Sequence, residues 1–150
     1  MHGSPVVFCE RTGNWAAAWR RVETRFAAHG DSRVNTPRLI ETRSPSECRE
    51  VLAKHRGAFV VAELSPPVLE PALDLLFQIR TEISEAATAV VTARPLRAYE
   101  WLARELGAQA FVVSPLELES LRVLAVRHLA KSAASYVDVR QRIWENLPWS

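Results

Sequence analysis

The sequence predicts an α/β fold in which helices cover both faces of a parallel β-sheet. Five short apolar runs recur along the chain, a segment with helical spacing follows each run, and the connections are short. Several runs are apolar throughout, which is typical of parallel strands buried on both faces. A chain of 150 residues has about the length of one domain. We therefore expect a single three-layer α/β/α sandwich.

Five segments are expected to form the strands. They are residues 5–9, 38–42, 58–62, 88–92 and 110–113. The second segment is the least apolar and has charged flanks, which favours an edge of the sheet. The alternation is compatible with a Rossmann-like half or with a flavodoxin-like sheet of order 2-1-3-4-5. In both arrangements the functional loops lie beyond the carboxyl ends of the strands.

The helical segments carry recognisable spacings and end signals. In the first helix, apolar residues recur at steps of four, three and four: Trp15, Trp19, Val22 and Phe26. A capping box begins the second helix: Ser44, Pro45 and Glu47. The third helix is expected to begin near Glu70, because Pro71 is tolerated only in a first turn. The fourth is expected over residues 96–106, and the fifth begins near Leu116.

Composition excludes several classes of function. Nineteen basic residues against seventeen acidic ones give a net charge of +2, which predicts no nucleic-acid partner. No apolar stretch approaches the roughly 18 residues that span a bilayer, and no signal peptide is recognisable, so we expect a cytoplasmic protein without a membrane partner. Cys9 and Cys48 cannot make a disulfide framework and are expected to be buried free thiols.

The residues expected at the carboxyl ends of the strands are the candidates for a functional site. They are Glu10, Arg11, Glu63, Leu64, Thr92, Ala93 and Ser114. No glycine-rich phosphate loop follows any strand, so nucleotide binding by those motifs is not expected. The nucleophile elbow of the α/β-hydrolases is absent as well.

Motifs in the second half of the chain resemble a known family. Residues 59–63 and 75–80 follow its third strand and third helix, and residues 89–93 follow a fourth strand that ends in Thr and a small residue. Residues 107–118 read Gly-Ala, an aromatic, two valines and Ser-Pro, where the family has Lys-Pro. This pattern resembles the receiver domain of bacterial two-component response regulators, over about residues 4–130. The resemblance implies a flavodoxin-like sheet of order 2-1-3-4-5.

The resemblance also implies a set of site positions. In receivers an acidic pair after the first strand holds Mg²⁺ and an aspartate ending the third strand accepts a phosphoryl group. Here the aspartate position holds Glu63, and the acidic pair falls on Glu10 with either Cys9 or Arg11. The phosphate-contacting position is kept as Thr92.

Two further positions of the family pattern lie on or after the fifth strand. The lysine that balances the phosphoryl charge is replaced by Ser114, and the aromatic that changes rotamer on activation is kept as Phe111. We expect Phe111 to be a core residue rather than a switch. For Thr92, we expect a cap on the following helix rather than a switch residue.

These departures predict a degenerate receiver, a pseudo-receiver that is not an enzyme and has neither metal nor cofactor. Glu63 is one methylene longer than aspartate, so its attacking oxygen is displaced by more than about 1 Å, which can lower a rate about a hundredfold. Arg11, if it points into the pocket, would replace the metal charge and pair with Glu63 or Glu10. Glu63 would then be either a solvated carboxylate or a mimic of the phosphorylated state.

The function predicted is therefore a signalling or regulatory module that binds other proteins. Two alternatives stay open: an active phosphoacceptor receiver in a phosphorelay, and a small-molecule sensor that uses the vacated pocket between Glu10, Glu63 and Thr92. Metal-dependent acyl-phosphate formation would favour the first, and ligand-dependent melting shifts the second.

Two surfaces are candidates for protein contacts, and nucleic-acid and membrane partners are not expected. The first is the face of the fourth helix, fifth strand and fifth helix, with Tyr99, Trp101 and Arg104. Tyr99 and Trp101 are two residues apart and cannot both lie in the core, and an exposed aromatic beside an arginine is typical of a binding hot spot. The second is a helical extension over 131–150, added to a receiver-like domain over 1–130. Five of its residues are spaced for a continued helix: Ala133, Tyr136, Val137, Arg140 and Trp144. A helix that extends past its own sheet needs something to pack against, so we expect a contact with a protein partner or a homodimer.

Overall fold

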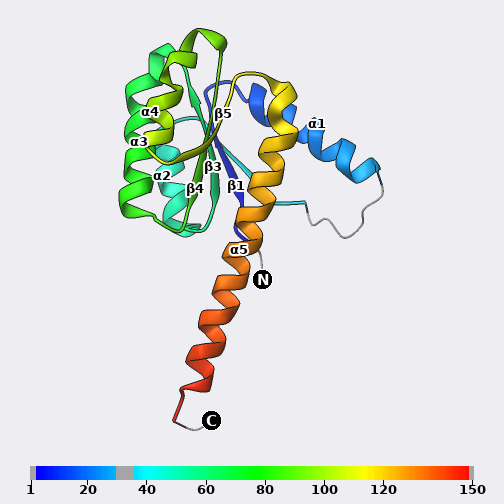
Figure 1. The fold of residues 1–150 in the computed structure, drawn as a ribbon, viewed down its shortest axis with the longest axis vertical. Coiled ribbons are helices and arrows are strands. Elements are labelled where there is room, and N and C mark those ends of the chain that lie inside the picture. Colours follow the sequence, from blue (N-terminus) through cyan, green and yellow to red (C-terminus); the bar gives the residue numbers. More distant parts are fainter. Residues whose placement is uncertain (1–2, 30–35, 149–150) are drawn as a thin grey trace.

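In the part of the chain that the structure describes, the sheet has five strands and all of its strand pairs are parallel. The computed structural model describes residues 3–29 and 36–148. The strands are β1 (Val6–Cys9), β2 (Leu39–Thr42), β3 (Phe59–Leu64), β4 (Ala87–Thr92) and β5 (Ala108–Val112). Their order is β2-β1-β3-β4-β5, with β2 at one edge and β5 at the other (Figure 1). This order confirms the flavodoxin-like arrangement and decides against the Rossmann-like half.

Helices cover both faces of the sheet, as the alternation predicts. In the described residues they are α1 (Asn14–Ala28), α2 (Pro45–Lys54), α3 (Leu69–Glu82), α4 (Glu100–Glu105) and α5 (Leu118–Glu145). α1 and α5 pack on one face, and α2, α3 and α4 pack on the other (Figure 1). Short 3-10 helices follow three of the strands: η1 (Pro66–Val68), η2 (Arg94–Tyr99) and η3 (Pro115–Glu117).

The core consists of two apolar layers separated by the sheet. Successive side chains of a strand point to opposite faces, so Phe8 contributes to the layer under α1 and α5 while Val7 contributes to the layer under α2 and α3. Phe8 meets Trp19 of α1 edge to face, with ring centroids 5.6 Å apart. Cys9 and Cys48 are free and buried, which confirms the prediction for the two thiols.

The sequence signals at the start of α2 are confirmed. The Ser44 side chain accepts a hydrogen bond from the backbone N–H of Glu47 at 3.2 Å, and Pro45 is the first residue of the helix. The Glu47 carboxylate accepts from the backbone N–H of Arg43 at 3.1 Å. The box is therefore closed one residue earlier than in its usual form, in which the glutamate binds the N–H of the capping residue itself.

Several elements differ from the sequence prediction. Strand β5 runs from Ala108 to Val112 instead of over 110–113, and α5 begins at Leu118, after η3, instead of near Leu116. The segment predicted as one long fourth helix is a 3-10 turn, η2, followed by an α-helix of only 6 residues. The proline near the start of η2 and the short connection from β4 favour the tighter turn there. Strand β3 is longer than predicted, because Glu63 and Leu64 still pair with Val91 and Thr92 of β4. Glu63 is thus the penultimate residue of a strand and not a loop residue.

Helix α5 is continuous over 28 residues and passes the expected boundary at residue 130 without a break. Its first half lies along the sheet, and its second half projects beyond the sheet (Figure 1). The helical prediction for the extension is confirmed as far as Glu145, whereas the Tyr136 and Val137 side chains lie outside the described residues. The first half is joined to α1 by a buried ion pair between Arg122 and Glu23 at 2.9 Å. None of the described helices has both the length and the apolar character needed to cross a membrane.

Candidate functional site

Glu10, directly after β1, is fully engaged by the backbone of α1. The residue is only 2% exposed, and its two oxygens accept hydrogen bonds from the N–H groups of Trp15 at 2.9 Å and Ala16 at 2.7 Å. These N–H groups belong to the first turn of α1, where no partner exists within the helix and where negative charge is favoured. The structural N-cap, Gly13, has a positive φ of 85° and no side chain that could do this. Glu10 therefore caps α1 from outside the helix.

Glu63 lies beside Glu10, because β1 and β3 are neighbours in the sheet. It is half-buried, and its Oε1 accepts one long hydrogen bond of 3.5 Å from the backbone N–H of Arg11. Burial is the main cause that raises the pKa of the Glu63 carboxyl. The Arg11 N–H opposes that shift, the nearby Glu10 adds to it, and the Arg11 charge and the Trp15 side chain oppose it more weakly.

The expected ion pair of Arg11 is not present. Arg11 is exposed, and no salt bridge of the described residues includes it. Its backbone, and not its guanidinium, reaches Glu63. The reason is that Glu10 already has two backbone donors and Glu63 one, so a guanidinium would gain little by leaving water.

Thr92 is buried at the end of β4 and its hydroxyl faces the neighbouring strand. The hydroxyl donates to the Leu64 carbonyl at 2.7 Å. The prediction that Thr92 caps the next helix is therefore wrong, because Ala93 occupies the cap of η2. A second hydroxyl at this edge, that of Ser65, is buried and has no hydrogen-bond partner.

Ser114 and Phe111 both make contacts that stabilise the fold. The Ser114 hydroxyl accepts from the Leu116 N–H at 3.2 Å and so caps η3 directly after β5. Phe111 is 7% exposed and packs with the apolar cluster beneath α3 and α4. Its burial agrees with the core reading.

The fold thus gathers Glu10, Glu63 and Thr92 at adjacent strand ends, with Ser114 farther along the same edge. The sequence analysis did not include Trp15 in this site, although its backbone N–H binds Glu10 and its side chain lies near Glu63. The apolar spacing of the first helix, which begins at Trp15, already placed this residue in the first turn of α1.

The site does not fit the Mg²⁺ ion that receivers hold. Mg²⁺ needs carboxylate oxygens that are free to coordinate it. Each oxygen of Glu10 already accepts a short hydrogen bond from the α1 backbone, so the carboxylate cannot turn toward an ion without giving up one of these contacts. Residues 3–29 and 36–148 contain no group of three or more His, Cys, Asp or Glu side chains arranged to hold a metal ion.

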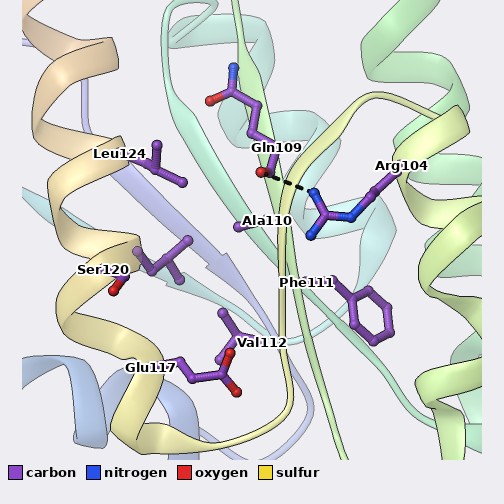
Figure 2. A pocket seen from close by; sticks show the side chains of 9 residues that line it. Arg104, Gln109, Ala110, Phe111, Val112, Glu117, Ser120 and Leu124 are labelled. Atoms are coloured by element: carbon purple, nitrogen blue, oxygen red, sulfur yellow. Dashed lines mark hydrogen bonds between the residues drawn. The ribbon is translucent and has the colours of Figure 1, made fainter.

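The α4–β5–α5 face, defined here by Trp101, Arg104 and Leu116, is open to solvent. Trp101 is 72% exposed and Leu116 is 91% exposed, whereas Tyr99 is half-buried. Arg104 pairs with Glu100 at 3.1 Å and also donates to the Gln109 carbonyl at 3.5 Å (Figure 2). A shallow cavity of about 210 Å³ lies on this edge of the sheet (Figure 2). It is lined by Arg104, Gln109, Ala110, Phe111, Val112, Glu117, Ser120, Leu121 and Leu124.

Solved structures share this fold at low sequence identity. The signal receiver domain of a Luxo repressor protein from Vibrio parahaemolyticus aligns with a TM-score of 0.69 and 12% identity, over 90% of this chain and 96% of that chain. A CheY-like receiver domain protein from Methanospirillum hungatei JF-1 aligns at 0.62 and 14%, over 87% and 97%. The receiver domain of the response regulator TorR of the TMAO respiratory system aligns at 0.58 and 22%, over 95% and 98%.

No family model and no curated protein matches the chain. At these identities the structural likeness describes the path of the backbone, and the chemistry has to be argued from the residues of the site. The sheet order, the placement of the helices and the three alignments agree with one another. This chain has the fold of response-regulator receiver domains.

Proposed function

We propose that this protein is a pseudo-receiver: a signalling or regulatory module that acts through protein contacts and does not accept a phosphoryl group. The observation that carries the proposal is the double hydrogen bond from the α1 backbone to Glu10, at 2.9 and 2.7 Å. In a working receiver the acid at this position must be free to hold Mg²⁺. Here its release would cost the cap of α1.

The other positions of the pocket support the same conclusion. Phosphoryl transfer depends on positive charge around the transferred group, and the position of the receiver lysine holds the uncharged Ser114, which already caps η3. The Thr92 hydroxyl is directed to a backbone carbonyl. The raised pKa of Glu63 marks a carboxyl in poor solvation, without the fixed cation that would steady a phosphorylated intermediate. A pocket in which Glu10 and Thr92 already bond the backbone offers a small ligand few polar contacts, so we do not favour a sensor.

The test of this part is a phosphorylation assay. The chain is incubated with Mg²⁺ and acetyl phosphate, beside a receiver that is known to accept a phosphoryl group, and both are analysed by intact mass. We expect no acyl phosphate on this chain, and no Mg²⁺ binding in calorimetry. A hydroxylamine-sensitive phosphoryl group that disappears in Glu63→Gln would overturn the proposal.

The contact surface proposed is the α4–β5–α5 face. Trp101 is the most exposed aromatic in the described residues and stands three residues from Arg104, a pairing that is common in binding hot spots. The cavity beside β5 gives this face a depression into which a partner side chain can fit. We expect a partner to lose at least about tenfold in affinity with Trp101→Ala.

Trp144 supplies the matched control for this surface. It is 68% exposed near the end of α5, in the half of the helix that projects beyond the sheet (Figure 1), so Trp144→Ala removes an aromatic of the same size outside the proposed interface. A purified partner that binds both variants as tightly as the wild type would exclude the α4–β5–α5 face.

A further inference from the structure

The apolar stripe that anchors α5 to the sheet continues along the second half of the helix, where the sheet no longer covers it. In the first half the stripe is buried: Leu118 is 0% exposed, Leu121 1% and Ala125 0%. The same side of the helix then carries Leu129 and Ser132, both half-buried. Farther on, Val139 is 50% exposed and Ile143 is 60% exposed.

The spacing shows that these residues form one stripe. In order along the helix the members are Leu118, Leu121, Ala125, Leu129, Ser132, Val139 and Ile143. Successive members are three, four, four, three, seven and four positions apart. These 25 positions correspond to almost seven turns at 3.6 residues per turn, so Ile143 lies under Leu118 on the same side of the helix. From Leu129 onward the steps of three, seven and four fit the seven-residue repeat of a coiled-coil seam. We call Leu129, Ser132, Val139 and Ile143 the α5 seam.

A free helix of this length is not stable by itself in water. The part from 131 to 145 has about 15 residues, the length at which isolated helices are marginal. Its sequence is no exceptional helix former, since Ser, Tyr and three β-branched residues interrupt it. Ile143 and its neighbour Trp144, which is 68% exposed, add apolar surface that favours burial.

We propose that the α5 seam is covered by the α5 seam of a second copy of this chain, in an antiparallel two-stranded pair. This inference rests on the proposed function only in naming one of the protein contacts of the module. It does not depend on whether Glu63 accepts a phosphoryl group.

The position of the sheet dictates the antiparallel direction. The seam is on the side of α5 that faces the sheet, so a second helix laid along it meets the amino edge of the sheet near Gly57. There the packing is already close: a Cβ at Gly57 would lie 2.5 Å from the Ser132 hydroxyl oxygen and 2.9 Å from that of Ser4. A parallel second helix would have to continue through this sheet, whereas an antiparallel one simply ends there.

The residues that face one another suit such a pair. In an overlap of the two free segments that differs by one position from exact centring, the large Ile143 of one copy comes opposite the small Ser132 of the other, so that a large side chain meets a small one at both ends of the overlap. The charged residues do not oppose the pairing. Arg140 and Arg142 flank the seam, but the positions opposite them, 133 and 135, are uncharged. Arg142 is in addition paired with Asp138 of its own helix at 3.1 Å.

The first experiment is sedimentation of the whole chain over a concentration series. We expect a reversible dimer with a dissociation constant on the order of 10 µM. The double substitution Val139→Glu with Ile143→Glu places charge in the seam and should weaken the dimer at least about a hundredfold. Ala134→Glu, exposed and on the opposite side of the helix from Ile143, adds the same kind of charge and should leave the dimer unchanged.

Circular dichroism keeps this comparison valid, because all variants should retain the β-sheet signal of the domain. A wild-type chain that remains monomeric at about 100 µM would overturn the inference. A dimer that survives the seam substitutions but is lost with Trp101→Glu would overturn it as well, and would assign self-association to the α4–β5–α5 face.

The second experiment fixes the direction by cross-linking under mild oxidation. In an antiparallel pair, chains with Ser132→Cys and chains with Ile143→Cys should cross-link when mixed, and neither should do so alone. Cross-linking of Ile143→Cys by itself would show a parallel pair and contradict the argument from the sheet. Wild-type chains serve as the blank, since Cys9 and Cys48 are buried.

Discussion

Glu10, directly after β1, and Glu63, near the end of β3, lie side by side, yet their surroundings are very different. Glu10 is 2% exposed and binds two backbone N–H groups at 2.9 and 2.7 Å. Glu63 is half-buried and has a single contact of 3.5 Å to the backbone of Arg11. The first carboxylate holds a helix in place, whereas the second lies in a partly dry position that raises its pKa. Two acids at one edge of a sheet can therefore have different uses, because the groups that each of them already binds differ.

The largest expected effect is that of removing the Glu10 carboxylate. Glu10→Ala leaves two N–H groups at the start of α1 without an acceptor, and we expect the free energy of unfolding to fall by about 3 kcal/mol. Glu63→Ala is the matched control and should cost less than about 1 kcal/mol. Urea titration followed by Trp fluorescence measures both. Equal losses for the two variants would contradict the assignment of Glu10 as the cap of α1.

The hydroxyls of the same edge should show a similar contrast on a smaller scale. Thr92→Val keeps the shape of the side chain but leaves the Leu64 carbonyl without its 2.7 Å hydrogen bond, so the free energy of unfolding should fall by about 1 kcal/mol. Ser114→Ala loses a cap at a partly exposed site and should cost about half as much. If Ser114→Ala were the more costly of the two, the hydroxyl of Thr92 would have to be free for another role.

Charge at the two carboxylates should act in opposite directions. Because the pKa of Glu63 is raised in the folded protein, the folded state binds more protons than the unfolded state between the ordinary glutamate pKa and the raised value. Stability thus falls as pH rises through this window, and above it the ionised Glu63 is unfavourable. Glu63→Gln should stabilise the protein slightly at pH 7 and lose this advantage below the ordinary glutamate pKa. Glu10→Gln should destabilise the protein at the same pH. If both substitutions changed the stability in the same direction, the proposed difference between the two carboxylates would be refuted. Thermal melts at a series of pH values provide the measurement.

The smallest change in stability is expected for a third carboxylate, Glu41 on β2. Hydrogen bonds from Arg20 and Arg43 lower the pKa of Glu41, so this acid stabilises the protein above its ordinary pKa and stops doing so as pH falls through the lowered value. Both arginines are largely exposed, and Glu41→Gln should therefore cost no more than about 0.5 kcal/mol. The cost should shrink further at high salt. A loss that is independent of salt would indicate packing rather than charge.

The alternation of strands and helices and the positions of most helices could be predicted from the sequence, because they depend on signals that are local. The order of the strands does not follow from such signals, because the alternation fits two arrangements and only the resemblance to receivers implied the observed one. The capping residues Ser44 and Pro45 marked the start of α2, and the spacing of apolar residues carried α5 beyond residue 130. The short α4 was predicted too long, since the apolar spacing of a 3-10 turn and that of an α-helix differ little over two turns.

The candidate site could be predicted only as a list of residues. The sequence placed Glu10, Glu63 and Thr92 at strand ends, but not the direction of their polar atoms. That direction depends on the loop after β1, where Gly13 takes a positive φ and brings the first turn of α1 back onto Glu10. It depends equally on the pairing of β3 with β4, which continues to Leu64 and offers its carbonyl to Thr92. Both are tertiary contacts that no local pattern encodes.

The unbroken course of α5 also has a mechanical consequence. The part beyond residue 130 has no loop at its base, so when its seam is covered this arm keeps its direction relative to the part that is fixed to the sheet and, through Arg122, to α1. At 1.5 Å per residue this arm is about 22 Å long, and a tilt of about 10° at its base displaces its tip by about 4 Å. A change of packing at the base that is too small to alter the sheet therefore causes a larger displacement at Ile143 and Trp144, where it would change the contacts with a bound partner.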